Sequence, residues 1–340
     1  MRPHKILYPF GALYGLIVKL RNKWYDKGWL NSETPSAYSI CVGNLSVGGT
    51  GKTPMIEYLI ELLLKENKNI AVLSRGYKRK TIGFLEVGPK ISVNEVGDEP
   101  FQIAQKYTNV KVFVDENRVE GVKKIKELYP QTDVFLLDDA FQHRSIKAHL
   151  NILLTRFDQL YTDDYYLPAG YLRDHKSRAE QAEVVVVTKC PADLNLESKR
   201  RIKSKLNLKS GQQLFFTGLR YNSPRTLFGS DISDQIDSFN YLAITGIAFP
   251  KPFIEHLGSL FSVQGQISYP DHYSFKSSDI SKWKNILSNQ ENPAIITTEK
   301  DAVRMLPFKI ELEGVKVFYI PINVSFLDGE QDFKNLVLKG

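Results

Sequence analysis

One stretch constrains the fold of this chain more than any other, the run YSICVGNLSVGGTGKTP at residues 38–54. A short apolar segment leads into a glycine-rich turn, and an apolar-periodic helix is expected from Lys52 onward. Glycines let successive backbone N–H groups turn towards one point without a Cβ clash, and a helix N-terminus adds unpaired N–H groups and the positive end of a dipole. This strand–turn–helix unit therefore predicts a phosphate-binding loop.

Each residue type in this loop has an expected task. The ammonium of Lys52 is expected to reach the β- and γ-phosphates of a nucleotide, and the hydroxyl of Thr53 to ligate Mg²⁺. The common pattern G-x-x-x-x-G-K-[ST] has glycine where this chain has Ser46, but the later glycines keep the loop pliable. An ordinary glycine-rich surface turn is the alternative. The predicted nucleotide contacts are Ser46, Val47, Gly48, Gly49, Thr50, Gly51, Lys52 and Thr53.

Length and composition set the broad class of the protein. The chain has 340 residues, which predicts about two domains, and 42% of them are hydrophobic, enough for sizeable cores. Cys41 and Cys190 fit no metal or redox spacing, so both are expected to be small buried residues in a reducing cytosol. No pair of histidines has a ligand spacing, so a zinc site built by the protein is not expected. The net charge of +7 favours an acidic partner, such as nucleic acid, an anionic membrane or a phosphorylated substrate.

The positive charge is concentrated in residues 1–30, where six Lys and Arg residues stand against Asp26 alone. The apolar part runs only from Ile6 to Val18 and contains proline and glycine, whereas a transmembrane helix needs ~20 apolar residues. No small-residue cleavage site follows, so a signal peptide is not expected. A helix in the membrane interface fits better, and a helix docked on the core is the alternative. The aromatic residues of the segment are Tyr8, Phe10, Tyr14, Trp24 and Trp29.

From residue 38 to about 190, short apolar runs alternate with helical stretches, within a P-loop kinase domain expected over residues 31–225. The runs lack polar alternation, as expected for strands buried on both faces. This pattern predicts an α/β fold with a P-loop NTPase-type parallel sheet flanked by helices, and a second, smaller α/β domain is expected over residues 226–340. The expected strands are 38–42, 69–74, 110–114, 133–138, 150–154 and 183–188 in the first domain, and 241–245, 294–298 and 315–322 in the second.

Polar residues follow these strands, and ligands bind beyond the carboxyl ends of strands in such sheets. Asp138 and Asp139 end an apolar strand and have the form of a Walker B element, whose carboxylate helps to hold Mg²⁺. Arg75 lies in a basic patch that either meets phosphates or is a solvated loop. Arg118 either holds an anion or is a surface residue.

Other positions have both a structural and a chemical interpretation. Asp98 opens a helix candidate and is either its N-cap or a general base near the γ-phosphate. His272 stands beside Asp271 and is either inert or helps to activate a hydroxyl. Arg173 and Asp174 follow a Leu-Pro-Ala-Gly turn and by themselves indicate only a charged loop.

The end of the strand at 183–188 bears on the choice of nucleotide. GTPases of this class end a strand with [NT]-K-x-D, whose aspartate pairs with guanine. Here Thr188 and Lys189 are followed by a cysteine and a proline, and the nearest acid, Asp193, is out of register. ATP is therefore the expected nucleotide.

Taken together, these motifs resemble those of the tetraacyldisaccharide 4'-kinases of lipid A assembly. They recur in the family's order over nearly the whole chain, so the resemblance is far more specific than the phosphate loop alone, and Ser46 is itself the family's form. Ala140 stands where the family usually has glycine, and Asp174 where it usually has glutamate, which shortens the reach to a metal. The matching segments are GNLSVGGTGKTP (43–54), SRGYKR (74–79), GDEP (97–100), DENR (115–118), DDAFQHR (138–144), LPAGYLRD (167–174), TGIAFP (245–250), PDHYSF (270–275) and TTEKDAVR (297–304).

The resemblance implies transfer of the γ-phosphate of ATP to the 4'-hydroxyl of a lipid A disaccharide 1-phosphate, forming lipid IVA. It implies that Asp98 and His272, drawn from separate domains, act as a dyad that removes the hydroxyl proton when the domains close around the active-site cleft. Lys52 would act on the phosphates. The implied Mg²⁺ shell is Thr53, Asp138, Asp139 and Asp174, and the candidate substrate contacts are Arg75, Arg118 and Arg173.

The implied partners are the lipid A disaccharide precursor and an anionic membrane surface, with no nucleic acid and no protein partner. The protein is expected to be peripheral, on the cytoplasmic face of the bacterial inner membrane, with residues 1–30 as its membrane-associating region. One alternative is a P-loop GTPase or ATPase that serves a metallo-enzyme or acts as a switch, which would carry Cys/His clusters and a guanine motif. The other is a non-catalytic nucleotide-switch or membrane-binding module, which would not need Asp98 or His272.

Overall fold

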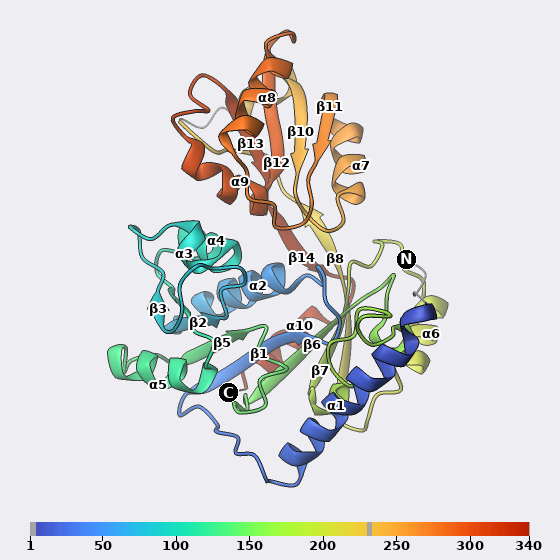
Figure 1. Ribbon diagram of the computed structural model, residues 1–340. Coiled ribbons are helices and arrows are strands. Elements are labelled where there is room, and N and C mark those ends of the chain that lie inside the picture. The colour runs from blue at the N-terminus through green and yellow to red at the C-terminus, as the bar shows by residue number, and fades with distance from the viewer. Residues whose placement is uncertain (1–4, 230–232, 340) are drawn as a thin grey trace.

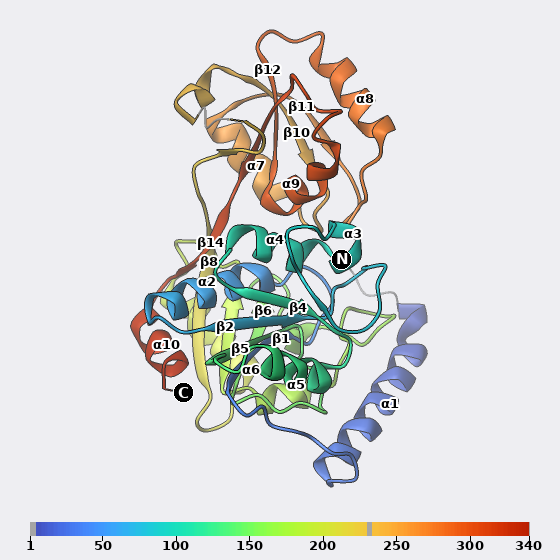
Figure 2. The same cartoon turned by 90° about the vertical axis from the view of Figure 1, so that its left-hand side faces the viewer.

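The protein consists of two lobes, each built on its own β-sheet, as the computed structural model of residues 5–229 and 233–339 shows (Figure 1). The larger lobe holds a nine-stranded sheet and the smaller lobe a five-stranded sheet. Figure 2 shows the smaller lobe standing above α3 (Val93–Val96) and α4 (Asp98–Lys106) of the larger one. The two lobes meet where α4 packs against α9 (Glu299–Met305).

The nine-stranded sheet has the order β14-β8-β7-β6-β1-β5-β2-β4-β3. Its strands are parallel except at the two edges, where β14 and β3 run antiparallel to their neighbours. The predicted fold class, a parallel-dominated sheet flanked by helices, is therefore confirmed. The strands are β1 (Tyr38–Asn44), β2 (Ile70–Ser74), β3 (Leu85–Glu86), β4 (Lys111–Val114), β5 (Val134–Asp138), β6 (Leu150–Arg156), β7 (Val184–Thr188), β8 (Gln213–Tyr221) and β14 (Ile322–Phe326).

Helices cover both faces of this sheet. One face packs against α2, α4 and α10, and the opposite face against α5 and α6. Val42 and Leu136 point into the first hydrophobic cluster, whereas their neighbours Cys41 and Leu137 point into the second, so neither face of the strands is polar. The helices of this lobe are α1 (Tyr8–Asp26), α2 (Lys52–Lys65), α3 (Val93–Val96), α4 (Asp98–Lys106), α5 (Arg118–Leu128), α6 (Leu196–Leu206) and α10 (Glu330–Val337), with short 3₁₀ turns at Lys5–Leu7, Tyr161–Asp163 and Lys176–Gln181.

The smaller lobe has the strand order β11-β10-β12-β13-β9, parallel except for β9. Its core lies on both faces of the sheet, around Trp283 on one side and Phe318 on the other. Its elements are β9 (Arg225–Thr226), β10 (Asn240–Thr245), β11 (Ser262–Ser268), β12 (Pro293–Thr298), β13 (Lys316–Ile320), α7 (Lys251–Leu260), α8 (Ser277–Leu287) and α9 (Glu299–Met305), with 3₁₀ turns at Ser233–Ser238 and Leu306–Phe308.

The chain crosses between the lobes twice, from β8 to β9 and from β13 to β14. The sequence predicts one strand over residues 315–322, which is wrong, because β13 ends at Ile320 and β14 begins at Ile322. Pro321 between them has no N–H to give to a ladder. The sequence predicts one smaller domain over residues 226–340. Its last two elements, β14 and α10, instead belong to the larger lobe.

Helix α1 docks on the larger lobe through a narrow face. Gly11, Gly15 and Val18 are buried, and Gly15 approaches the ring of Tyr166 so closely that a Cβ would lie 2.7 Å from it. Most other apolar side chains of the helix face outward. Within the described residues, every helix is too short or too polar to traverse a bilayer. The exposed apolar side chains of α1 are Phe10, Leu13, Leu16, Ile17, Leu20 and Trp24.

The close approach of Gly43 in β1 to Phe141 gives a stability prediction. A Cβ at Gly43 would lie 2.4 Å from Cβ of Phe141, so Gly43→Ala must displace the segment after β5 and is expected to destabilise the fold by about 1–3 kcal/mol in urea unfolding. Gly88→Ala is the matched control, because no atom lies within 4 Å of a Cβ there. An unfolding midpoint of Gly43→Ala equal to that of Gly88→Ala would contradict the expected clash.

Candidate active site

The predicted phosphate loop connects the central strand β1 to α2. Gly48 and Gly51 have φ values of 107° and 87°, a region that side chains rarely adopt, so these two glycines are required by the backbone. The amide of Asn44 donates to the Thr50 hydroxyl at 2.9 Å, and the hydroxyl of Thr188 donates to the Thr50 carbonyl at 2.8 Å. These contacts fix the loop from below and leave the backbone of Gly48 and Gly49 exposed at its tip.

Ser46 explains the departure from the common loop pattern. Its hydroxyl donates to Oδ2 of Asp164 at 3.0 Å, and its carbonyl accepts from the Asn44 amide at 2.6 Å. The next residue, Val47, is held by a backbone bond from its N–H to the carbonyl of Tyr171 at 2.8 Å. A serine at this position therefore ties the start of the loop to the segment around residue 170, a contact that glycine would lack.

Two adjacent aspartates end β5 next to this loop. Asp138 is buried, with Oδ2 accepting from the Ser74 hydroxyl at 3.0 Å and Oδ1 without a partner. Burial, with the nearby charges of Glu99 and Asp139, raises the pKa of Asp138 to about 7. Burial and the neighbouring negative charges oppose the ionisation of Asp138, and its Oδ1 has no partner. Binding of a cation at this oxygen would therefore be favourable.

Asp139 has the opposite electrostatic setting. Its Oδ1 lies 3.7 Å from Nζ of Lys52, and the guanidinium of Arg173 donates to both carboxylate oxygens. Burial alone would raise the pKa of Asp139, but Lys52 and Arg173 outweigh it and hold that pKa well below its usual range. Asp139 is therefore ionised and links the loop lysine to the segment that carries Arg173.

Arg75 and Arg118, two of the predicted substrate contacts, differ in their exposure. Arg75 is exposed after β2 and has no hydrogen-bond or ion-pair partner among the described residues. Arg118 is fully buried, and its guanidinium donates to the backbone carbonyls of Asp115 at 2.5 Å and Asp138 at 3.3 Å. A side chain with no exposed surface cannot touch a substrate in this conformation, so the substrate contact expected for Arg118 is replaced by a structural role beneath Asp138.

Asp174 also differs from its expected place in a metal shell. Its Oδ1 accepts from the Asn22 amide at 2.8 Å and from the His175 N–H at 2.7 Å, and its Oδ2 lies 3.7 Å from Nε of Arg178. These contacts use the carboxylate to anchor α1. The side chain of Asp174 therefore contacts α1. It makes no contact with Thr53, Asp138 or Asp139 in the structure.

Asp98 and His272 come together across the boundary between the lobes. Oδ2 of Asp98, the first residue of α4, lies 2.9 Å from Nδ1 of His272, which follows β11 with a φ of 56°. Among the described residues, Oδ1 of Asp98 accepts only from the adjacent N–H of Glu99, at 3.1 Å. The N-cap of the helix is Gly97, not Asp98. The ring of Tyr77 packs edge-on against His272 at 5.2 Å.

Helix α9 completes this cluster with two residues that sequence reasoning missed. Arg304 donates from Nε and Nη2 to Oδ2 of Asp98, at 3.0 and 2.5 Å, and Lys300 places Nζ 3.0 Å from Nε2 of His272. Burial would raise the pKa of Asp98, but the hydrogen bond from His272 and the charges of Lys300 and Arg304 lower it well below the usual range. The signal available in the sequence was the four-residue spacing of Lys300 and Arg304, which puts both on one side of a helix.

A second buried charge cluster joins the phosphate-loop helix to the smaller lobe. Nζ of Lys106, at the end of α4, lies 2.5 Å from Oε2 of Glu57 in α2 and 3.1 Å from Oε1 of Glu299 in α9. The amide of Gln102 donates to the other oxygen of Glu57 at 2.8 Å. Burial and the charge of Glu299 raise the pKa of Glu57 to about 7 despite Lys106. No local pattern marks these residues, because they lie far apart in the sequence.

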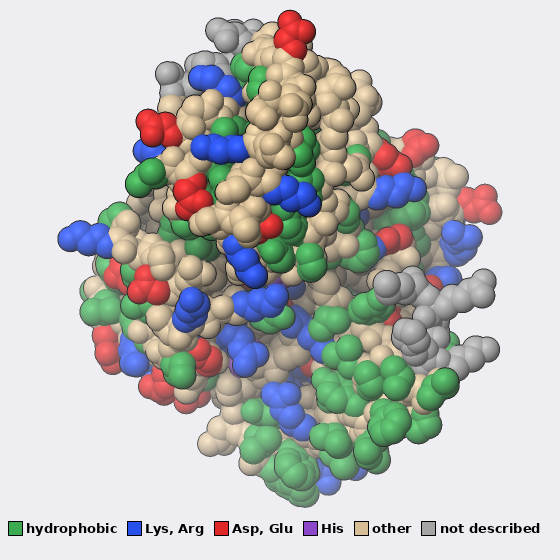
Figure 3. Space-filling view, turned by 45° about the horizontal axis from the view of Figure 1, so that its top comes forward, with side chains coloured by type: hydrophobic (Ala, Val, Ile, Leu, Met, Phe, Trp, Pro, Cys, Tyr) green, Lys and Arg blue, Asp and Glu red, His purple; other side chains and the backbone are tan. Residues whose placement is uncertain are grey.

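The loop after β10 forms another contact between the lobes. The ring of Phe249 lies over the guanidinium of Arg156 at 3.6 Å and 5.2 Å from Nζ of Lys189. Burial lowers the pKa of Lys189 to about 8, and its ammonium lies close to Gly49 of the phosphate loop. Figure 3 shows Lys and Arg side chains gathered in the hollow below the smaller lobe, beside a hydrophobic patch over α1.

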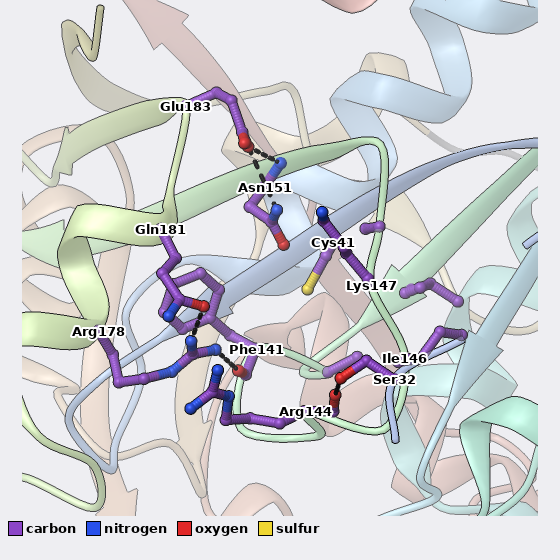
Figure 4. A pocket seen from close by; sticks show the side chains of 13 residues that line it. Ser32, Cys41, Phe141, Arg144, Ile146, Lys147, Asn151, Arg178, Gln181 and Glu183 are labelled. Carbon is purple, nitrogen blue, oxygen red and sulfur yellow. Dashed lines mark hydrogen bonds between the residues drawn. The ribbon is translucent and has the colours of Figure 1, made fainter. Parts of the chain in front are cut away.

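A separate cavity of about 400 Å³ lies against the other side of the segment after β5 (Figure 4). Its charged side chains are largely paired: Arg178 donates to the carbonyl of Phe141, Arg144 to Asp26, and Glu183 accepts from Asn151. The cavity also meets Cys41, whose pKa is raised to about 12 by burial. Cys190 is likewise buried, so both cysteines are the small buried residues that the sequence predicts.

Comparisons with known proteins agree with this geometry. The sequence profile of the family described as tetraacyldisaccharide-1-P 4'-kinase matches residues 3–340. A tetraacyldisaccharide 4'-kinase of Flavobacterium johnsoniae is 44% identical over 338 residues, covering 98% of this chain and 96% of that protein. One of Bacteroides thetaiotaomicron is 41% identical over 346 residues, covering 97% and 90%. A crystal structure of LpxK from Aquifex aeolicus in complex with ATP matches with a TM-score of 0.76 at 30% identity and covers 97% of each chain.

The raised pKa of Glu57 predicts a pH-dependent stability. Between pH 4.5 and about 7 the unfolded chain carries the charge while the folded protein keeps the proton, so this carboxyl lowers the stability of the fold increasingly as the pH rises through that window. Glu57→Gln has no proton to lose. Its free energy of unfolding relative to the parent protein should therefore increase by about 1–3 kcal/mol between roughly pH 5 and pH 8, as measured by urea titrations. Glu66→Gln, exposed at the end of the same helix, is the control, and a Glu57→Gln difference that stays constant with pH would contradict this account.

Proposed function

We propose a mechanism from one premise, which is that this chain belongs to the tetraacyldisaccharide-1-P 4'-kinase family. It is accordingly an ATP-dependent kinase that phosphorylates the 4'-hydroxyl of a lipid A disaccharide precursor. A P-loop accessory or switch protein is not favoured by this membership. The observation that carries the mechanism is the contact between Asp98 and His272, 2.9 Å apart and drawn from different lobes next to a phosphate loop.

The phosphate loop is proposed to hold the triphosphate of ATP through the backbone N–H groups of Gly48, Gly49, Gly51, Lys52 and Thr53, since those of Val47 and Thr50 are already bonded to backbone carbonyls. The exposed tip at Gly48 and Gly49 and the N-terminus of α2 support this, because both present N–H groups without partners in the loop. Lys52 is proposed to neutralise the β- and γ-phosphates, and its 3.7 Å distance from Asp139 orients its ammonium. Positioning and charge stabilisation of this kind account for most of the catalysis in phosphoryl transfer.

The residues at the end of β5 fit Mg²⁺. Oδ1 of Asp138 is a buried carboxylate oxygen without a partner, and Thr53 lies in the first turn of α2. Among the described residues no cluster of three acidic, histidine or cysteine side chains forms a complete metal site, which suits Mg²⁺, because it is usually held by one or two carboxylates and the substrate phosphates. We propose that Thr53 and Asp138 hold it with help from Asp139, and that it supplies charge neutralisation at the phosphates.

The acceptor hydroxyl is proposed to lose its proton to the dyad of Asp98 and His272. The 4'-oxygen forms a bond to the γ-phosphorus while the bond from that phosphorus to the β,γ-bridging oxygen breaks. The electron pair stays with ADP, and the hydroxyl proton passes to Asp98. Arg304 and His272 both donate to Oδ2 of Asp98, which supports a carboxylate held ionised and fixed in direction.

The acceptor is amphiphilic, and α1 is proposed to bring the site to the bilayer surface. The outward apolar face of α1 and the surrounding Lys and Arg residues support contact with an anionic membrane. Because ATP is the donor, that surface is the cytoplasmic face of the inner membrane. Arg75, which is exposed and unpaired among the described residues, is the strongest candidate to meet the phosphate of the acceptor, whereas Arg173 is already bound by Asp139.

The first functional prediction concerns the dyad. Asp98→Asn and His272→Gln are each expected to lower kcat by roughly 10²–10⁴-fold, the usual contribution of a positioned acid–base group, while ATP still binds. Turnover is followed as transfer of label from ATP to the 4' position of a tetraacylated disaccharide 1-phosphate, and ATP binding by calorimetry. Lys111→Met, which alters an exposed pair on β4, is the control. Near-normal turnover in both dyad variants would refute the assignment.

The second functional prediction concerns the binding of α1 to a membrane. Replacing Leu13, Ile17 and Leu20 together by serine removes outward apolar surface and leaves the buried glycine face of α1 intact. The variant is expected to sediment much less with vesicles of anionic phospholipid than the parent protein does, because membrane binding scales with buried apolar area and with charge. Its circular dichroism and its turnover of detergent-dispersed acceptor should be unchanged. Undiminished sedimentation would exclude α1 as the membrane contact.

A further inference from the structure

The two ring nitrogens of His272 face groups of opposite hydrogen-bonding character. Nδ1 lies 2.9 Å from Oδ2 of Asp98, and Nε2 lies 3.0 Å from Nζ of Lys300. An ionised carboxylate can only accept a hydrogen bond, and an ammonium can only donate one. A neutral imidazole has one nitrogen of each kind. Of the three protonation states of the ring, only the neutral form with its proton on Nδ1 satisfies both neighbours at these distances.

Both neighbours of His272 are held in their charged state, Asp98 as a carboxylate and Lys300 as an ammonium. Asp98 also receives Nε and Nη2 of Arg304 on Oδ2, so a proton on that oxygen would displace strong donors. Lys300 lies 3.3 Å from Glu99 and 3.8 Å from Asp271. Burial disfavours its ammonium, but the charges of Glu99, Asp98 and Asp271 reverse that effect and raise the pKa of Lys300. A protonated Nε2 would then place two donors 3.0 Å apart.

We propose that Lys300 is a positioning residue of this kinase, which fixes the tautomer of His272 by occupying Nε2 and so directs the Nδ1 proton to Asp98. The proposal rests on the proposed function of the dyad and adds to it the identity of the accepting atom. With Nε2 occupied, the imidazole has no lone pair for a substrate proton. Oδ2 of Asp98 already accepts from His272 and Arg304, whereas Oδ1 accepts, within the part of the chain that the structure describes, only from the N–H of Glu99.

The hydroxyl proton therefore goes to Oδ1 of Asp98. His272 acts through its hydrogen bond to Oδ2, which fixes the direction of the carboxylate, and Lys300 acts through His272. The two side chains that hold Oδ2 of Asp98, those of His272 and Arg304, belong to the smaller lobe, and so does Lys300. The accepting oxygen is thus aimed only when the lobes are together.

The direct test is the protonation state of His272 in the intact protein, read by ¹⁵N NMR after labelling of histidine and assigned by the signal lost in His272→Gln. In the parent protein near neutral pH we expect Nδ1 to be protonated and Nε2 to be unprotonated. In Lys300→Met the repelling ammonium is gone, while Asp98 still faces Nδ1 and Asp271 lies 3.8 Å from Nε2. Nε2 then no longer accepts from an ammonium and is free to carry the ring proton, so its ¹⁵N signal is expected to move from the parent position.

The other groups around His272 stay the same in this comparison, since Tyr77, Arg304 and Glu99 are unaltered. Lys300→Arg keeps a donor and should restore part of the parent pattern. Lys111→Met is the matched control, because Lys111 pairs with Glu86 at the same 3.3 Å as Lys300 with Glu99 but lies on the surface. It should leave the signals of His272 unmoved.

Kinetics supply the second measurement. Lys300→Met is expected to lower kcat roughly 10- to 100-fold, as losing a partner that orients a functional histidine does elsewhere, with the KM for ATP unchanged. A protonated Nε2 in the parent protein, or an unaltered ¹⁵N pattern in Lys300→Met, would overturn the proposal. Because the NMR measurement needs no turnover, it is independent of the kinase assignment: active Asp98→Asn and His272→Gln variants would refute the dyad while leaving the tautomer as found.

Discussion

Buried charges on each lobe are neutralised by the other lobe, and the arrangement of the site depends on this pairing. Asp98 of the larger lobe is met by Arg304 and His272 of the smaller one, and Lys106 is met by Glu299 as well as by Glu57. A buried charge that loses its partner destabilises a structure by about 3–5 kcal/mol. The surfaces of α4 and α9 are therefore complementary in charge. The dyad of Asp98 and His272 is formed as part of the same contact.

The phosphate loop shares in this contact through α2. Lys52 begins the helix and Glu57 lies little more than one turn later, roughly 7.5 Å along the axis at 1.5 Å per residue. The start of α2 thus receives phosphates in the proposed mechanism, and Glu57, in the second turn of the same helix, is bound through Lys106 to Glu299 of α9. The proposed phosphate site and the lobe boundary are therefore joined through one short helix. Within the described residues the chain itself crosses between the lobes only next to β8 and β14, which pair with each other at one side of the larger sheet.

The sequence predicted what is encoded locally. Buried parallel strands, the glycines of the phosphate loop and the acids that end β5 follow from residue type and spacing over a few positions, and all lie where such patterns put them. Asp98 and His272 were candidates from local residues, but their pairing was expected only through resemblance to a family, since 174 residues separate them. Other features depend on distant contacts that no window contains. Arg118 carries the polarity of a surface residue but is enclosed beneath Asp138, Asp174 is drawn to α1 by Asn22, and Pro321 divides an apolar run so that β14 joins the other sheet.

The low pKa of Asp98 has a consequence for its proposed role. A carboxylate surrounded by Arg304, Lys300 and His272 is a weak base, which would be a poor choice if the hydroxyl had to be ionised before it attacked. Phosphoryl transfer passes through a loose transition state, in which the bond to the incoming oxygen is little formed and its proton is lost late. In such a reaction the direction of the accepting oxygen matters more than its proton affinity. The surrounding cations reduce the basicity of Asp98, and the same contacts fix the carboxylate in one orientation, with Oδ1 as the oxygen left to meet the acceptor.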